Sequence, residues 1–411
     1  MMKKEYEVLK NAKKIVLAYS GGLDTSVIAS WLKEKSAKEV ICVSVDLGQV
    51  ENPLALEKKA IKSGASKFYN INVEKEFIED YAFKIVKANA KYENAYLLGT
   101  AIARPLIAKV LVDVAKKEGA DVIAHGCTGK GNDQIRFELA IMSLDPDIKV
   151  IAPWRFWDIK SRSEEEAYAK AHNIHLDNEK EEDYSMDENL WHISHEGLDL
   201  ENPENPANFD KCLHWVTYPQ KAKDQAEYVN IEFEKGLPIA IDGNKMDGVS
   251  IVKYLNKIGG QNGIGINDLV ESRKCGMKSR GLYENPAASI LYFAHEKLES
   301  LTMHPDILQY KQKMALDYAN VVYSGKWMTP LKEAMDAFID ISQENVTGNV
   351  KLQLYKGNIN VYGIEAKNSL YMEEYATFEE DSVYNQADAS GFINIYGLSS
   401  KIYAKATKEV V

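Results

Sequence analysis

Residues 14–26 read Lys-Ile-Val-Leu-Ala-Tyr-Ser-Gly-Gly-Leu-Asp-Thr-Ser. Its first part, Lys14 to Tyr19, is a short apolar run typical of a buried strand. From Thr25 to Glu34 the apolar side chains recur on one helical face. The two adjacent glycines between these elements let the backbone approach an anion closely, and the following helix offers free amide groups. The stretch therefore predicts a strand, an anion-binding turn and a helix.

The alternation of short apolar runs and helical patterns continues outward to about residue 160. Strands are predicted over residues 40–45, 67–73, 121–124 and 149–152, and helices over 53–63, 76–90 and 101–118. Short strands separated by helices are typical of an α/β, doubly wound parallel sheet. Because ligands of such sheets bind at the carboxyl ends of the strands, the turns after the strands are the candidate site.

From residue 228 the pattern changes to α+β. Hairpins are predicted over residues 228–242, turning at 235–237, and over 348–363, turning at 356–358. Helices are predicted over 249–258, 287–298, 306–323 and 330–341. The acidic, Asn/Pro-rich stretch 161–210 is interpreted as a helix followed by surface segments that connect two domains.

The tail, residues 369–411, is apolar but short, so we predict an arm that packs on another subunit. The expected organisation is an α/β domain that carries the anion-binding turn over residues 1–165, an α+β domain over 166–365 and an oligomerisation arm over 366–411.

Composition excludes several classes of protein. The 411 residues carry 50 Lys and Arg against 61 Asp and Glu, a net charge of −11, which disfavours nucleic acid and anionic membranes as partners. An apolar fraction of 45% excludes wholesale disorder, and no apolar run approaches the roughly 18 residues of a membrane span. The start is polar, and the four cysteines form no C-x-x-C pair, so we expect a reduced, cytoplasmic protein without a disulfide frame.

Only six of the basic residues are arginines: Arg104, Arg136, Arg155, Arg162, Arg273 and Arg280. Where Lys is the default cation, a retained Arg indicates a place that needs a planar fork for carboxylate or phosphate. All but Arg162 fall in or beside the motifs described below, so we expect the arginines to map an anion-binding pocket.

The turn after the first strand has the chemistry of a polyphosphate site. Ser20, Thr25 and Ser26 add hydroxyl donors to the backbone amides of the turn and helix. No lysine lies inside it, so it is not a Walker A loop. Asp24 fits such a loop if Mg²⁺ lies between its carboxylate and the phosphates.

The second motif, His125-Gly-Cys-Thr-Gly-Lys-Gly-Asn-Asp-Gln-Ile-Arg-Phe-Glu138, also follows a predicted strand. Its three glycines indicate a close-approach loop. Asn132 and Arg136 lie four residues apart and therefore share a helix face. A loop with these donors, an acceptor and cations suits a zwitterionic small molecule. By contrast, the pairs His172/His175 and His192/His195 lack the pattern of a metalloprotease, so no metal ligand is predicted there.

Ser20-Gly-Gly-Leu-Asp24 with Thr25-Ser26 resembles the pyrophosphate loop of the N-type ATP pyrophosphatases. The whole chain, through further motifs in order, resembles the argininosuccinate synthase family within that superfamily. These motifs are residues 97–105, 125–138, 151–155, 185–190 and 276–281.

The resemblance implies a reaction in which citrulline, aspartate and ATP give argininosuccinate, AMP and pyrophosphate through a citrulline adenylate. It also implies that ATP is a substrate accompanied by Mg²⁺, and that the enzyme is a cytoplasmic homotetramer. Such an enzyme is an AMP-forming carbon–nitrogen ligase of arginine biosynthesis.

The resemblance also implies residue roles. The expected ATP-binding residues are Ala18, Tyr19, Ser20, Gly21, Gly22, Leu23, Asp24, Thr25, Ser26, Val45 and Gly126. Aspartate is expected at Thr128, Asn132 and Asp133, and citrulline at Tyr96, Ala101, Asn132, Arg136, Ser185, Ser194, Glu271 and Tyr283. Asp24, Asp133 and Arg136 are the expected catalytic residues. Ala101 stands where the family often has a hydroxyl residue, so its contact is expected to be through backbone. No general base for the aspartate amine is identified.

Three alternative functions fit the sequence less well. A tRNA-thiolating enzyme of the same superfamily needs a basic face and usually a cysteine pair, which the composition does not favour. A glutamine-fed amidotransferase needs a glutaminase domain, and no stretch resembles one. A non-catalytic nucleotide-binding protein is disfavoured by the intact Asp24, Arg136 and Glu271.

Overall fold

The computed structural model describes residues 2–174, 184–379 and 383–408. They form two compact units, Met1–Asn368 and Ser369–Val411. None of the helices in these ranges is long and apolar enough to cross a membrane.

The first unit contains the predicted parallel sheet, in the order β3-β2-β1-β4-β5. Its strands are β1 (Lys14–Ala18), β2 (Glu39–Asp46), β3 (Lys67–Asn72), β4 (Val122–Ala124) and β5 (Lys149–Ile151). All four neighbouring pairs are parallel. Since β1 leads to β2 on one side and β4 lies on the other, the strand order reverses between β1 and β4, where such sheets bind ligands.

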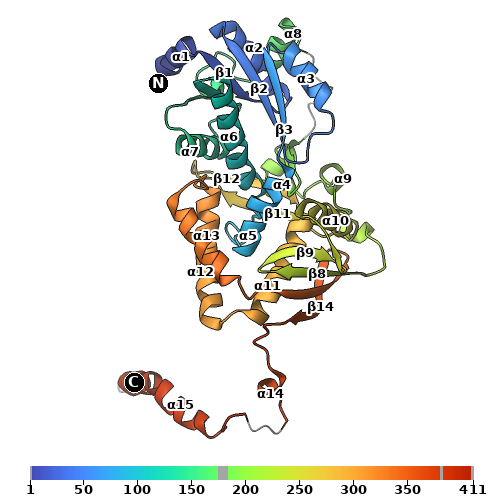
Figure 1. The fold of residues 1–411 in the computed structure, drawn as a ribbon, viewed down its shortest axis with the longest axis vertical. Helices are drawn as coiled ribbons and strands as arrows, with labels where there is room; N and C mark the ends of the chain where they lie inside the picture. Colours follow the sequence, from blue (N-terminus) through green and yellow to red (C-terminus); the bar gives the residue numbers. More distant parts are fainter. Residues whose placement is uncertain (1, 175–183, 380–382, 409–411) are drawn as a thin grey trace. The chain divides into compact units, whose positions relative to one another are not determined.

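Helices cover both faces of this sheet (Figure 1). They are α1 (Met2–Asn11), α2 (Leu23–Ser36), α3 (Pro53–Lys62), α6 (Gly99–Glu118), α7 (Asp133–Leu144) and α8 (Arg162–Ala171). Alternation along β1 shows the two cores: Ile15 and Leu17 pack in the cluster that contains Trp31 of α2, whereas Val16 packs in the cluster that contains Ile102 of α6. The doubly wound arrangement predicted from the alternation of strands and helices over the first 160 residues is confirmed.

The helix predicted over residues 76–90 differs in detail. The chain forms α4 (Glu74–Glu76), a π-helical segment over Phe77–Ala82 and α5 (Phe83–Lys87). The π segment turns Phe77, Ile78, Tyr81 and Ala82 into the core. The apolar spacing predicts a buried helical face and does not distinguish this wider π turn from a regular helix.

The second half of this unit contains a five-stranded antiparallel sheet in the order β10-β9-β8-β13-β14. Its strands are β8 (Glu227–Glu234), β9 (Leu237–Ile241), β10 (Asn244–Lys245), β13 (Gly348–Tyr355) and β14 (Asn358–Ala366). Both predicted hairpins are confirmed, and their turns have positive φ at Lys235, Gly236, Lys356 and Gly357. The predicted helices are α10 (Gly248–Gln261), α11 (Pro286–Thr302), α12 (Pro305–Tyr323) and α13 (Pro330–Ser342).

A third sheet was not predicted. It is antiparallel, in the order β11-β12-β7-β6, with β6 (Ser185–Asn189), β7 (His192–Glu196), β11 (Ile266–Ser272) and β12 (Lys278–Glu284). The interpretation of residues 161–210 as a helix and surface segments is therefore wrong for β6 and β7, and most of β7 is buried. The acidic run at 179–183 in the same interpretation lies outside the described residues.

Figure 1 shows α6 extending from the parallel sheet toward β11 and β12. Helix α6 contacts both β1 and β6, so it links the parallel sheet to the third sheet. The expected boundary at residue 165 falls inside α8.

The described residues of the second unit form three helices, α14 (Glu373–Ala376), α15 (Asp388–Tyr396) and α16 (Leu398–Thr407). None of them buries a side chain. Large apolar side chains are exposed along it, including Phe378, Ile395 and Tyr403.

Candidate active site

A cavity of about 1290 Å³ lies where the carboxyl ends of β1, β2 and β4 face the third sheet. The parallel sheet contributes the turn after β1, Val43 to Val45 of β2, and the loop after β4. The third sheet contributes Glu271 of β11, Tyr283 of β12, and residues of β6 and β7. The cavity therefore joins regions that are far apart in the sequence.

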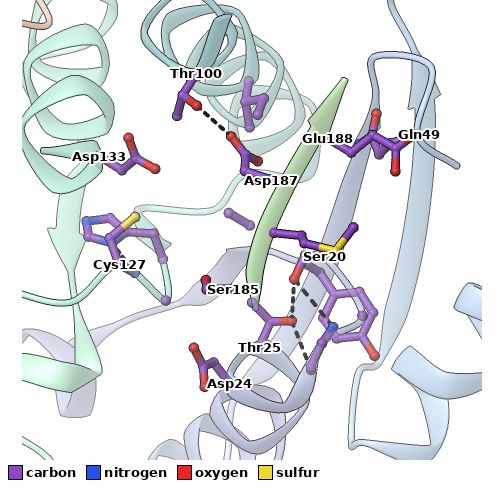
Figure 2. Close-up of a pocket in the computed structure, with 18 of the residues that line it drawn as sticks. Ser20, Asp24, Thr25, Gln49, Thr100, Cys127, Asp133, Ser185, Asp187 and Glu188 are labelled. Carbon is purple, nitrogen blue, oxygen red and sulfur yellow. Dashed lines mark hydrogen bonds between the residues drawn. The ribbon is translucent and has the colours of Figure 1, made fainter. Parts of the chain in front are cut away.

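The turn after β1 has the geometry of an anion cradle. Gly21 has φ +84°, and a Cβ atom there would lie 2.3 Å from the Leu56 side chain. The amide of Gly22 donates to Ser20 Oγ at 3.4 Å, and Ser20 Oγ lies 3.2 Å from Thr25 Oγ1. Helix α2 begins without a side-chain cap, so its first amides remain available to an anion. Figure 2 shows Ser20, Asp24 and Thr25 grouped at the end of α2.

The loop after β4 packs closely on this cradle. A Cβ atom at Gly126 would lie 3.4 Å from Thr25 Cγ2. The β11–β12 turn holds the other end of the loop: the amide of Lys274 donates to Asn132 Oδ1 at 2.8 Å, and Asn132 Nδ2 donates to Tyr323 Oη at 2.8 Å. Asn132 is thus fixed as the residue that precedes α7.

The buried Arg136 lies on α7 beside Asp133. Its Nη1 donates to Asp133 Oδ1 at 2.8 Å, and its Nε donates to the Tyr323 carbonyl at 3.1 Å. Its guanidinium carbon lies 4.8 Å from the centre of the Tyr323 ring. Burial disfavours the charged form of Asp133, but the guanidinium groups of Arg104 and Arg136 outweigh it and lower the pKa of that carboxyl.

On the other side of the cavity, the hydrogen-bonding capacity of the Glu271 carboxylate is largely unused. Its side chain is buried, and Tyr283 Oη donates to Oε1 over a long 3.5 Å. Oε2 is buried with no hydrogen-bond partner within the described ranges. Burial raises the pKa of Glu271, and the charge of Arg136 and the nearby Tyr323 hydroxyl partly offset this. A cationic ligand group would satisfy the buried acceptor.

Strand register explains why the third sheet faces the cavity. Tyr283 pairs with Ser194, and Ser194 pairs with Asp187, so the three side chains share one row of the sheet. Ser185 lies two residues before Asp187 and points to the same face. In Figure 2, Ser185 lies near Ser20 and Thr25, and Asp187 lies toward Thr100.

Nearly all of the residues expected at the site line this one cavity. Those that do are Ala18, Tyr19, Ser20, Gly21, Gly22, Leu23, Asp24, Thr25, Val45, Tyr96, Gly126, Thr128, Asn132, Asp133, Arg136, Ser185, Ser194, Glu271 and Tyr283. Ser26 and Ala101 are buried and are not among the lining residues. The Ser26 hydroxyl lies 3.1 Å from Tyr19 Oη, and the neighbour of Ala101, Thr100, lines the cavity.

The expected ligand-binding sets omitted further polar residues of the cavity, among them Gln49, Thr100, Arg104, Asp187 and Glu188. Gln49 bridges its own turn, because its Nε2 donates to the Val45 carbonyl at 2.8 Å and its Oε1 accepts from the Leu47 amide. Of these residues, Arg104 could have been identified from the sequence, because it is one of the few arginines and lies inside a motif.

The expected map of arginines needs correction. Arg104, Arg136, Arg162 and Arg273 line the cavity, whereas Arg155 and Arg280 do not. Arg155 instead pairs with Glu138, and Arg280 pairs with Asp268. Arg162, which the motifs left out, reaches the cavity because α8 packs on α2.

No group of three or more His, Cys, Asp and Glu side chains in the described part of the chain could hold a metal ion. All four cysteines are free. Asp24 lines the phosphate end with a carboxylate close to the cradle, which fits Mg²⁺, since this ion commonly uses one or two carboxylates together with substrate phosphates.

Two family models match the chain. "Arginosuccinate synthase N-terminal HUP domain" matches residues 14–175, and "Arginosuccinate synthase C-terminal domain" matches residues 184–403. The chain is 54% identical to the argininosuccinate synthase of Clostridium perfringens over 98% of this chain and 99% of the relative. The chain belongs to the argininosuccinate synthase family.

Two further relatives agree with this membership. Identity is 55% with the argininosuccinate synthase of Acetivibrio thermocellus and 56% with that of Desulforamulus reducens, each over 96% of this chain and 98% of the relative. The family predicted from the motifs, the α/β fold class and the enzyme class of a ligase are thereby confirmed.

Proposed function

We propose that this chain ligates citrulline to aspartate at the expense of ATP, giving argininosuccinate, AMP and pyrophosphate. The observation that carries the proposal is a buried Glu271 oxygen that has no hydrogen-bond partner among the described residues, in the same cavity as the Ser20–Thr25 cradle. A carboxylate suited to an ammonium group and a cradle suited to phosphates then serve one reaction.

Citrulline is expected at the third sheet, with its ammonium group on Glu271 and its carboxylate on Arg136. Tyr96, Ser185, Ser194 and Tyr283 line the same region and complete the proposed binding set. Ala101 is proposed to contact citrulline through its backbone, beside Thr100, which lines the cavity. Arg136 is buried and fixed by Asp133 and Tyr323, so its fork is oriented before substrate arrives.

ATP is expected with its phosphates on residues 18–26 and against Gly126, and its base near Val45. The ureido oxygen of citrulline attacks the α-phosphorus, a new P–O bond forms, and the bond to pyrophosphate breaks. The amides of α2 and the hydroxyls of Ser20 and Thr25 stabilise the leaving pyrophosphate by hydrogen bonds to its developing charge. Mg²⁺ bound beside Asp24 would supply further charge neutralisation.

Aspartate is expected on Thr128, Asn132 and Asp133, at the loop after β4. Its amine attacks the activated ureido carbon, the C–O bond breaks, and AMP leaves with the former ureido oxygen. Asp133 is held as a carboxylate by two guanidinium groups, and this charge suits an ammonium group before it loses its proton.

The proposed division of the chain into residues 1–165, 166–365 and 366–411 follows these roles. The exposed apolar side chains of residues 369–408 support the proposal that this arm packs on another subunit, within a homotetramer. Four free cysteines and an acidic surface charge support a reduced, cytoplasmic setting without nucleic acid or membrane as partners.

The test is release of AMP and pyrophosphate with either amino acid omitted. Without citrulline, neither product is expected. Without aspartate, pyrophosphate release is expected to stop after one equivalent per site, because the adenylate is not consumed. Release of both products at an unchanged rate without citrulline would refute the proposal.

A further inference from the structure

We infer that Arg104 and Asp187 are positioning residues for Asp133, and that they control the aspartate step separately from the ATP step. The inference rests on the proposed function, in which Asp133 receives the aspartate ammonium group. Neither residue belongs to the proposed binding sets.

Arg104 lies on α6 and reaches two carboxylates at once. Its Nε donates to Asp133 Oδ2 at 2.9 Å, and its Nη2 lies 3.0 Å from Asp187 Oδ2. The other oxygen of Asp133 accepts from Arg136. Asp133 is therefore clamped between two forks, and its orientation depends on where Arg104 is held.

Asp187 in turn is held from α6 and β7. Thr100 Oγ1 donates to Asp187 Oδ2 at 2.9 Å, a contact drawn in Figure 2. The same hydroxyl lies 3.1 Å from His192 Nε2. Since the Thr100 proton points to Asp187, its oxygen accepts from His192, which fixes the imidazole with its proton on Nε2.

The packing that allows this contact is tight. A Cβ atom at Gly99 would lie 2.5 Å from the His192 ring, so only glycine lets α6 begin this close to β7. Burial lowers the pKa of His192 to about 4, so the ring is neutral at physiological pH. A continuous series of side-chain contacts therefore links the third sheet to α7, in the order His192–Thr100–Asp187–Arg104–Asp133.

The charges around Asp133 make the effect of this series of contacts measurable. The groups that face Asp133 are Arg104 from α6, Arg136 from α7, Cys127 from the loop after β4, and Asp187 and His192 from the third sheet. Two of them are permanent cations. Without the Arg104 charge, Asp133 is buried with one cation, and its protonated form becomes easier to reach as pH falls. A protonated Asp133 cannot accept an ammonium group as a charged partner.

The experiment compares Arg104→Met, Arg104→Lys and Asp187→Asn with the unaltered enzyme. The first half of the reaction is measured as citrulline-dependent exchange of pyrophosphate into ATP without aspartate. The second is measured as kcat and KM for aspartate between pH 5.5 and 9. Arg280→Lys is the matched control, because Arg280 also forks onto an aspartate, Asp268, but lies outside the cavity.

We expect Arg104→Met to raise the aspartate KM about tenfold or more and to move the acidic limb of kcat/KM for aspartate to higher pH. The rate of citrulline-dependent pyrophosphate exchange into ATP should stay within about threefold of that of the unaltered enzyme. Arg104→Lys, which keeps the charge, should restore most of the pH profile but not the KM. Asp187→Asn should show a smaller change of the same kind, and Arg280→Lys none.

Equal losses in exchange and in the aspartate step would mean a general structural role and would overturn the inference, as would an unchanged aspartate KM. Aspartate binding is also measured by calorimetry, which needs no turnover. Weaker aspartate binding in Arg104→Met therefore supports the inference even if the unaltered chain forms no argininosuccinate, in which case only the proposed function fails.

Discussion

The phosphate cradle after β1 and the third sheet meet in the same cavity but are built in opposite ways. The cradle uses backbone amides, two glycines and a helix end, with its hydroxyls only a few residues apart. The third sheet uses side chains from four strands spread over residues 185–284. A site built on backbone leaves a contiguous pattern in the sequence, whereas a site built on strand register leaves almost none.

The strands themselves explain the difference. β6 reads Ser-Met-Asp-Glu-Asn and carries polar side chains on the face that lines the cavity. The apolar alternation that identifies a strand is therefore absent where the strand serves a polar site. If the cradle and the third sheet have these separate roles, substitutions in the cradle should stop the ATP step. Substitutions in the third sheet should then weaken the use of one amino-acid substrate at a time.

The largest effect is expected from Gly21→Ala. This residue has φ +84°, which strains an alanine, and its new Cβ would lie 2.3 Å from Leu56 Cδ1, so we expect the amides of the cradle to shift. Citrulline-dependent pyrophosphate exchange should fall by about 10²–10³-fold, as for the loss of an oxyanion-hole donor. Gly119→Ala is the control, since Gly119 has φ +66° but open space around it. Exchange that survives in Gly21→Ala would break the account of the cradle.

The next effect concerns Glu271→Gln. The amide keeps the shape but loses the charge that a buried ammonium group needs. The loss of about 1.5–3 kcal/mol in transition-state stabilisation should lower kcat/KM for citrulline roughly 10–100-fold. KM for ATP should stay near its original value. Asp268→Asn, on the same strand but outside the cavity, serves as the matched control. A larger change in the KM for ATP than for citrulline would contradict the separation of the two regions.

Arg136→Lys should have a smaller but specific effect. Lysine keeps the charge and loses the fork that contacts Asp133 and the Tyr323 carbonyl together. We expect a loss of ~1–3 kcal/mol in citrulline recognition, seen as kcat/KM. Unchanged kcat and KM for citrulline would show that the fork is not used.

The third sheet should also carry an acid-sensitive part of the stability. The pKa of His192 is about 4 in the folded chain, below its ordinary value of 6.5, so the unfolded chain binds a proton that the folded chain does not. Stability should therefore fall as pH falls from about 6.5 toward 4, by roughly 1 kcal/mol per pH unit for this group.

His192→Gln should reduce the dependence of stability on pH, measured from urea unfolding midpoints at several pH values. The contribution of His295, whose pKa is also about 4, should remain. Asp187, Arg104, Asp133 and His195 face the His192 ring and are unchanged by the substitution. An identical slope in both proteins would contradict a neutral, buried His192.

The smallest effect on chemistry is expected from deletion of residues 369–411. No side chain of its three helices is buried, so its removal should leave the cavity of the first unit intact. Sedimentation velocity should then show a smaller assembly with nearly the original exchange activity per chain. An unaltered sedimentation profile would contradict an oligomerisation arm.

Prediction from the sequence succeeded where local pattern and structure coincide. The strands before residues 20 and 125, the hairpin turns and the helices of the second half all follow period and turn residues, as Gly236 and Gly357 show. The family resemblance supplied Ser185, Ser194 and Glu271, which no spacing connects. Arg162 and the link from Thr100 to Asp187 could not be predicted, because helix packing and strand register bring them to the cavity.

The most direct test of the central claim follows one oxygen atom. If the cradle activates citrulline held at the third sheet, the ureido oxygen becomes bonded to the α-phosphorus and leaves with AMP. Citrulline labelled with ¹⁸O at the ureido position is converted with aspartate and ATP, and the AMP is examined by mass spectrometry. The account predicts one ¹⁸O in each AMP phosphate, and AMP without the label would contradict it.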